Sequence, residues 1–283
     1  MSLIILRECS MGILYGDLDL WLDTISDVTI TNTVERTLIP RKNLFNQKST
    51  QAIIHKNNDK TTGTFTCYLT DKFKESILFN LLGCSVYANG FVVPDIVVKP
   101  EQYTPAKFVI ASPYNAYEVN DVLITSITFP LGKGFAGEMQ VSFEGGELVQ
   151  TPRSFTHIFN KSQDSHIKLS PLEFIFDEIP YSAISANINI AQNITWVDSK
   201  SIYDTFNRKR PVVTGHNVNI TTSQYHRNES ILPSFENIMI KQGQFQLTME
   251  QASITRRLGL EEDIITLSCD IQPSSHMPII QII

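Results

Sequence analysis

The sequence predicts a mainly β protein of the α+β class: two tandem β-sandwich or barrel domains, each with one helix. Two observations support this prediction. Alternating apolar and polar residues recur along most of the chain, and short sequence matches recur in the same order in both halves. The 283 residues suffice for two domains, and 42% hydrophobic residues suffice for a buried core.

The strand prediction rests on period-two alternation, which places one face of each strand on a core and the other in polar surroundings. Thr, Val, Ile and Phe dominate these runs, as is typical of β-strands. The runs lie at 27–34, 64–69, 139–143, 188–190, 245–249 and 265–269.

Two segments have helical spacing instead. Residues 71–82 place apolar side chains on one helical stripe, with Thr70 as the expected N-cap and Gly83 as the C-terminal stop. Residues 229–241 repeat such a stripe, and Pro233 suits the first turn of a helix. We therefore expect one helix in each half.

Matches between the halves indicate a tandem duplication. Both expected helices contain Glu-Ser-Ile-Leu, at 75–78 and 229–232. Ser-Ile-Thr, two residues and Leu-Gly follow at 126–132 and at 253–259. Each match alone could arise by chance, but their common order in both halves supports a duplication.

These matches also set the expected domain boundaries. The first domain covers 1–150, with an insertion at about 86–113. Residues 151–168 form a polar linker, and 169–283 form the second domain. The second domain ends in an apolar C-terminal extension, which we expect to need a partner surface.

Composition narrows the range of functions. The net charge of −6 leaves no strongly basic footprint for gripping phosphates. The four cysteines are widely spaced among apolar neighbours, which favours reduced, buried thiols and folding in the cytoplasm. The sequence has neither a basic leader nor an apolar window long enough for a membrane helix, so no membrane association is expected.

No residue pattern indicates catalysis, a cofactor or a metal site. The six histidines lack a compact metal-binding spacing, and no G-x-S-x-G elbow occurs. Gly132-Lys133-Gly134 departs from the phosphate-loop pattern and fits a turn between strands. An enzyme with dispersed catalytic residues is the third hypothesis, and it predicts a concave pocket with converging catalytic groups.

The charged loop clusters are the candidate contact sites. The basic clusters could contact nucleic acid, and the acidic cluster could form half of a metal site. Solvated loops, or contacts with a neighbouring copy, fit the net charge better. The candidate inter-ring contacts are Arg41, Lys42, Arg208, Lys209, Arg210, Glu261, Glu262 and Asp263.

The order strand, strand, long loop, strand, helix, strand, strand, present twice, resembles the tail-tube fold of long-tailed bacteriophages. The resemblance covers almost the whole chain, and the insertion at 86–113 departs from a minimal tube domain. It implies homotrimeric, pseudo-hexameric rings that stack around a DNA channel without binding the DNA specifically. Other tail or baseplate proteins would be partners, and the protein would be assembled in the host bacterial cytoplasm and located in the virion tail.

Three functions therefore stand in order. The first is a tail-tube subunit or, as its near alternative, a trimeric baseplate hub or adaptor ring at the tube end. The second is a carbohydrate- or receptor-binding β-sandwich, which predicts exposed aromatic side chains grouped on one sheet face. The third is a hydrolase whose catalytic residues are dispersed along the sequence.

Overall fold

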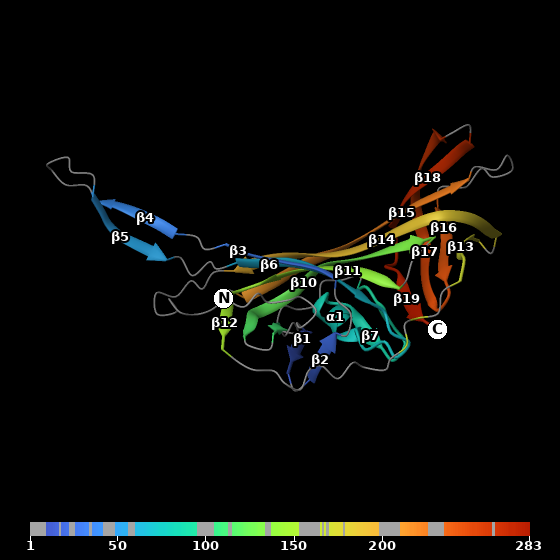
Figure 1. The fold of residues 1–283 in the computed structure, drawn as a ribbon. Coiled ribbons are helices and arrows are strands. Elements are labelled where there is room, and N and C mark those ends of the chain that lie inside the picture. The colour runs from blue at the N-terminus through green and yellow to red at the C-terminus, as the bar shows by residue number, and fades with distance from the viewer. Residues whose placement is uncertain are drawn as a thin grey trace.

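The computed structural model of the protein describes most of the chain. The described residues are 10–16, 18–22, 26–33, 36–41, 49–55, 60–94, 105–112, 115–133, 137–152, 165, 167, 170–177, 179–197, 210–225, 235–261 and 264–283. Within these residues the structure is almost entirely β, as the alternation predicts, and it contains one α-helix. Long strands run across the molecule, and shorter strands gather below and to the right in Figure 1.

Where it is described, the first half contains twelve strands and the helix α1 (Ser76–Leu81). The strands are β1 (Ser10–Tyr15), β2 (Leu18–Leu22), β3 (Ser26–Thr33), β4 (Arg36–Arg41), β5 (Ser49–His55), β6 (Lys60–Tyr68), β7 (Ser85–Tyr87), β8 (Gly90–Val92), β9 (Ala106–Ala111), β10 (Ala116–Gly132), β11 (Glu138–Gly145) and β12 (Leu148–Thr151).

The second half contains seven strands among its described residues, three of them sixteen residues or longer. They are β13 (Leu172–Phe176), β14 (Ile179–Val197), β15 (Arg210–Tyr225), β16 (Phe235–Gln242), β17 (Phe245–Glu261), β18 (Ile264–Pro273) and β19 (Ile279–Ile282).

Eight strands pair in one continuous antiparallel order, β3–β6–β11–β10–β14–β15–β18–β17. The first four belong to the first half and the last four to the second. The β10–β14 ladder joins the halves, from Ser126 opposite Ala191 to Gly132 opposite Ser185. A single sheet therefore crosses the boundary between the two predicted domains.

The order of pairing is the same in both halves. The series β3–β6–β11–β10–β9 in the first half corresponds to β14–β15–β18–β17–β16 in the second, and β12 lies on β10 as β19 lies on β17. In the second half β13 joins β16 to β14, so six strands close into a barrel. In the first half β1 and β2 extend from β9, and the described residues contain no β2–β3 pairing.

β10 and β17 also share a β-bulge. The register shifts by one residue just before Val122 in the β9–β10 ladder and just before Ala252 in the β16–β17 ladder. The residues at these points, Asp121 and Gln251, have positive φ angles of 54° and 52°. Positive φ is uncommon outside glycine, so its occurrence at the same place in both strands is informative.

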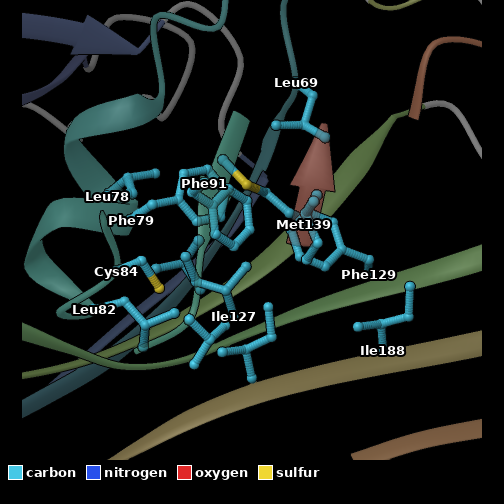
Figure 2. Packing of buried hydrophobic residues seen from close by; sticks show 14 of the residues in the cluster. Leu69, Leu78, Phe79, Leu82, Cys84, Phe91, Ile127, Phe129, Met139 and Ile188 are labelled. Atoms are coloured by element: carbon cyan, nitrogen blue, oxygen red, sulfur yellow. The ribbon is translucent and has the colours of Figure 1, made fainter. Parts of the chain in front are cut away.

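One hydrophobic cluster extends through both halves and lies against α1. Figure 2 shows Phe79 beside Phe91, with Phe129 further into the core. The ring centroids of Phe79 and Phe91 are 4.0 Å apart, and those of Phe129 and Phe245 are 5.1 Å apart. This aromatic series connects the helix of the first half to β17 of the second.

The predicted helix at 71–82 is confirmed in its second half only. Phe73 has a φ of 49°, so residues before Glu75 form turns, and α1 begins at Ser76. The Thr70 hydroxyl donates to the Glu75 carboxylate, 3.0 Å away, within that turn instead of capping the helix. The predicted stop is correct: Gly83 has a φ of 80°, which suits a residue just beyond a helix end.

The helix predicted at 229–241 is wrong over its described part, and so is the expectation of one helix per repeat there. Residues 229–234 lie outside the described residues, and from Phe235 onwards the chain forms β16. Ile238 and Ile240 are buried at period-two spacing, and β13 and β17 pair with both edges of the strand. Pairing with a strand on each edge outweighs a short helical apolar pattern.

Buried side chains hold the halves together where β10 and α1 end. Gln242 Nε2 donates to the Gly132 carbonyl at 2.9 Å, and its Oε1 accepts from the Gly132 amide at 3.1 Å. Gln192 Nε2 donates to the Leu81 carbonyl at 2.8 Å, and His216 Nε2 lies 2.9 Å from the Leu82 carbonyl. Second-half side chains thus satisfy C-terminal carbonyls of α1, which a helix leaves without intrahelical partners.

The apolar C-terminal extension finds a partner surface within its own chain. Strand β19 lies between β17 of the second half and β8 of the first half. Ile280 and Ile282 point into the core, whereas Ile279 is 43% exposed. The β7–β8 hairpin, from the predicted insertion, therefore holds the last strand of the chain.

Candidate functional site

The broadest candidate site is one face of the eight-strand sheet, called here the polar face. Opposite residues of neighbouring strands lie on the same face of a sheet, so the ladders define its members. Its uncharged polar side chains, all partly or fully exposed, are Thr29, Thr31, Thr33, Thr62, Thr64, Thr66, Ser126, Thr128, Gln140, Ser142, Ser185, Asn187, Asn189, Asn217, Asn219, Thr221, Ser223, Ser253, Thr255, Ser268 and Gln272.

Hydrogen bonds run across this face between neighbouring strands. The Thr29 and Thr64 hydroxyl oxygens are 2.7 Å apart, and the Thr128 hydroxyl donates to Asn189 Oδ1 at 3.1 Å. The second bond crosses the β10–β14 ladder that joins the halves. The polar face is therefore continuous through the middle of the molecule.

The charged side chains described on the polar face are few and have partners. Lys60 Nζ lies 2.8 Å from Glu144, and Arg257 lies 3.2 Å from Asp270. The Tyr68 hydroxyl donates to Glu138 at 3.2 Å, and burial together with that carboxylate raises the pKa of Tyr68. The face therefore offers hydroxyls and amides with little net charge.

A shallow hollow of about 350 Å³ lies on the polar face across β10, β14, β15 and β18. Its polar lining includes Ser185, Asn187, Thr221, Ser223, Ser268 and Asp270. Asp270 is the charged residue of this lining, and no lysine, arginine or histidine contributes to it. The hollow therefore lacks the cations that bind phosphate groups.

The structure places three of the eight sequence-predicted contact residues. Arg41 ends β4 opposite Ser49, Arg210 begins β15 opposite Val197, and Glu261 ends β17 opposite Ile264. Lys42, Arg208, Lys209, Glu262 and Asp263 lie outside the described residues. The contact role of all eight residues remains a prediction.

These placements separate the basic and acidic positions. Arg210 and Tyr225 are the two ends of β15, a sixteen-residue strand that spans roughly 50 Å. Tyr225 is opposite Thr266, two residues from the start of β18 and hence near Glu261. The structure thus puts Arg210 and Glu261 at opposite ends of the sheet.

Side chains that could react or bind a metal lie in the core or far from one another. Cys67, Cys84 and Cys269 are buried thiols outside any disulfide, as expected from their apolar neighbours, and burial raises the pKa of Cys67 and of Cys84. Cys9 is not among the described residues. In the part of the chain that is described, no three His, Cys, Asp or Glu residues are grouped as metal ligands would be.

Aromatic side chains do not form a platform on the described surface. The exposed aromatic residues there are Tyr87 on β7 and Tyr225 at the end of β15, on strands that do not pair. A Cβ atom on Gly12 would lie 2.7 Å from the Trp21 ring, so Trp21 packs over β1. None of the described helices is long and apolar enough to span a membrane.

Sequence reasoning found the polar alternation of individual strands but missed two features of the site. It did not identify Gln192 and Gln242 as the side chains that join the halves, because no local pattern distinguishes them from exposed glutamines. It also missed the pairing of Lys60 with Glu144, whose separation in sequence hides their contact.

These features describe a mainly β protein with an extended, nearly uncharged sheet face. A family model described as the Bacteriophage Baseplate Tube Protein Family matches residues 1–282. The chain belongs to this family, whose members are structural components of the phage baseplate or tail tube, and so of the virion. No curated protein sequence matches the chain.

Proposed function

We propose that this protein is a subunit of a phage tail or baseplate tube, in which three copies close into a pseudo-hexameric ring around a DNA channel. The observation that carries the proposal is the polar face, which continues across eight paired strands and both halves of the chain. A subunit with such a face can line a water-filled channel while its opposite face remains in an apolar core.

Duplication within the chain supports the pseudo-hexameric arrangement. Both halves have the same order of strand pairing, and both carry a bulge with a positive-φ residue, Asp121 or Gln251. Independent origins would not be expected to yield both. Three chains of two equivalent domains supply six similar units to one ring.

The chemistry of the polar face suits DNA that passes without being held. Tight binding to DNA requires lysines and arginines on phosphates, with release of counterions. Lys60 and Arg257, the cationic residues described on this face, each lie beside a carboxylate. The chain as a whole is acidic, with a net charge of −6, so its field opposes adhesion of DNA.

The two ends of the sheet suit stacking of rings. The β4–β5 hairpin projects away from the body at one end (Figure 1), and the basic positions Arg41 and Arg210 lie at that end. Glu261 lies at the other end, on the tip between β17 and β18. Lys133, on the neighbouring tip after β10, is basic, so these two tips differ in charge.

The first test is the mass of the purified protein in solution, combined with negative-stain micrographs. We expect a trimer and end-on views of rings with a central hole. A protein that stays monomeric at concentrations up to about 100 µM, well above common dissociation constants, would contradict the proposal.

Stacking is tested by reversing one basic cluster. Replacing Arg208, Lys209 and Arg210 by glutamate should abolish tube formation and leave single rings, because acidic loops would then face acidic loops. The double variant Lys72→Glu and Lys74→Glu, which changes charge beside α1, should still form tubes. Tubes of normal length in the triple variant would exclude this contact.

A baseplate hub or adaptor ring at the tube end is the second candidate, and the unequal ends of the molecule favour it. The β4–β5 hairpin is present at one end only of the described structure. A hub stacks on one side, whereas a tube subunit stacks on both. Filaments of the purified protein would select the tube subunit, and single or paired rings would select the hub.

A further inference from the structure

The second-half barrel has an outer surface that faces away from the polar face. In its pairing order β13–β14–β15–β18–β17–β16, strand β16 is three places from β15, and β13 is three places from β18. Strands β13 and β16 therefore lie across the barrel from β15 and β18, which carry the polar face. Strands β17, β19, β8 and β7 continue this surface into the first half, below the long strands in Figure 1.

A row of mainly apolar side chains crosses this surface from the first half to the second. Ile279 on β19 is opposite Val92 on β8 and Thr248 on β17. Thr248 is opposite Met239 on β16, and Met239 is opposite Ile175 on β13. Opposite residues share a face of the sheet, so these five side chains, none of them buried, form one row across five strands.

Two larger side chains extend the row at its first-half end. Ile279, Gln281 and Ile283 alternate with core-facing residues, so Ile283, which is 61% exposed, lies on the same side as Ile279, which is 43% exposed. Gln281 is opposite Gly90, and Gly90 is opposite Tyr87, which is 59% exposed. Three of the six large apolar side chains that are exposed in the described residues therefore lie here. The apolar residues of this surface, called here the outer patch, are Tyr87, Val92, Ile175, Met239, Ile279 and Ile283.

Carboxylates border one side of the outer patch. Glu250 lies two residues beyond the row on β17, and Asp177 lies two residues beyond the row at the end of β13; both are exposed. Asn237 on β16 lies between them, and its backbone amide donates to the Asp177 carboxylate at 3.2 Å. On the other side Lys241 is opposite Glu173, so their charges balance. The net charge that borders the outer patch is therefore negative.

We infer that the outer patch is a docking surface for a basic amphipathic helix of another protein. An apolar patch with a polar margin is typical of protein contacts, and exposed carboxylates favour a partner with lysines or arginines beside its apolar side chains. The row crosses five strands, about 19 Å, which is the length of a helix of about 13 residues. The inference rests on the proposed function, because a polar face that lines the channel leaves the outer patch on the outside of the ring.

A second copy of the chain fits this surface less well. Two copies that meet patch to patch would bring Glu250 and Asp177 near the same carboxylates of the other copy, and contacts between like charges cost free energy. The whole chain is also acidic, with a net charge of −6. A basic docking segment removes both costs, so the occupant that we infer is a different protein.

A fluorescent 14-residue peptide of leucine and lysine, arranged as an amphipathic helix, tests the docking surface on the purified full chain. Fluorescence anisotropy should show binding by the unmodified protein. Ile279→Ser with Tyr87→Ser should bind about tenfold more weakly, because both truncated side chains lie in the outer patch. The same peptide with glutamate in place of lysine should also bind about tenfold more weakly to the unmodified protein.

Leu258→Ser is the matched control, since Leu258 is 66% exposed but lies on β17 outside the outer patch. This variant should bind the leucine–lysine peptide as the unmodified protein does. Glu250→Gln with Asp177→Asn should weaken binding about three- to tenfold, because the apolar contact remains. Equal binding by the unmodified protein and by Ile279→Ser with Tyr87→Ser, or an equal loss in Leu258→Ser, would overturn the inference.

Solution mass, measured on the same samples, separates this inference from the proposed function. Rings that bind neither peptide would overturn the docking surface and leave the ring proposal intact. Binding of the leucine–lysine peptide by a protein that forms no rings would contradict the ring proposal alone, and absence of both would contradict both. If Ile279→Ser with Tyr87→Ser loses the rings, the outer patch is a contact between copies and the inference is wrong.

Discussion

At the scale of single residues, Gly63 demonstrates how tightly the first half is packed. A Cβ atom at this position would lie 2.5 Å from both the Phe143 ring and the Thr29 carbonyl oxygen. In β15, the second-half counterpart of β6, Ile220 is fully buried. In the second half the side chain of the strand residue itself fills the core, whereas in the first half the Phe143 ring fills the space beside Gly63.

We predict that Gly63→Ala destabilises the protein by about 1–3 kcal/mol, because backbone and ring must both move. Gly215→Ala is the matched control, since a Cβ there meets nothing within 4 Å. The free energies of unfolding from denaturant titrations measure both. Equal effects of the two substitutions would show that packing at Gly63 does not matter.

His216 couples the junction between the halves to pH. Burial lowers its pKa below the usual value of 6.5, although its hydrogen bond to Leu82 acts in the other direction. The unfolded chain therefore binds more protons than the folded chain once the pH falls below about 6.5. Folding stability contributed by neutral His216 is complete above that pH and is lost as the pH falls towards the lower, folded-state pKa.

We expect the free energy of unfolding to decrease between about pH 7 and pH 5, and to decrease less in a His216→Gln variant. Glutamine can still donate to the Leu82 carbonyl but does not titrate. Parallel denaturant titrations at several pH values give the two slopes. Identical slopes would assign the pH dependence to other groups.

At the scale of elements, β19 is a short strand with a large structural role. It satisfies backbone groups of β17 on one edge and of β8 on the other, so it belongs to both halves. Gly90 permits the close approach, because a Cβ there would lie 2.2 Å from the Ile280 carbonyl oxygen.

Adjacent isoleucines of β19 provide an internal comparison. Ile280→Ala should cost about 2–5 kcal/mol, since the side chain is fully buried. Ile279→Ala should change stability much less, by about 0.5 kcal/mol, since that residue is 43% exposed on the other face. Thermal or denaturant midpoints distinguish them, and a large effect of Ile279→Ala would place its side chain against an unidentified surface.

The elements also mark the limits of sequence-based prediction. Alternation correctly predicted β6, β11, β17 and β18, because each has one apolar and one polar face. The apolar residues near Ile238 fit both helical and strand spacing, and only the neighbouring strands decide between them. Ser126 and Ser253 matched in sequence, but Ser126 lies five residues after the bulge residue Asp121 and Ser253 only two after Gln251. Short sequence matches therefore carried little information about register.

At the scale of the whole molecule, the sequence predicts which residue types form the polar face but not how many strands it spans. Thr, Asn, Ser and Gln at alternate positions indicated a wet surface on each strand. Which strands are neighbours depends on long-range pairings such as β10 with β14, and these leave no local signal. The neutral character of the face likewise depends on ion pairs between distant residues.

The proposed assembly should respond to salt in two stages. Stacking through charged loops would weaken when ionic strength rises from about 0.1 M to about 1 M, since the screening length falls from about 10 Å to about 3 Å. Contacts within each ring should persist, because they would depend on packing and backbone hydrogen bonds more than on charge. Sedimentation should therefore show tubes giving way to trimers, and direct conversion of tubes to monomers would contradict this division of roles.

The β7–β8 hairpin has a consequence for how such an assembly would meet its neighbours. It occurs in the first half, and the described residues of the second half contain no counterpart of it between β15 and β16. A closed trimer would then present sixfold similarity along its inner wall and threefold decoration on its exterior. Components with either symmetry could attach to the same ring, one kind end-on and the other at the circumference.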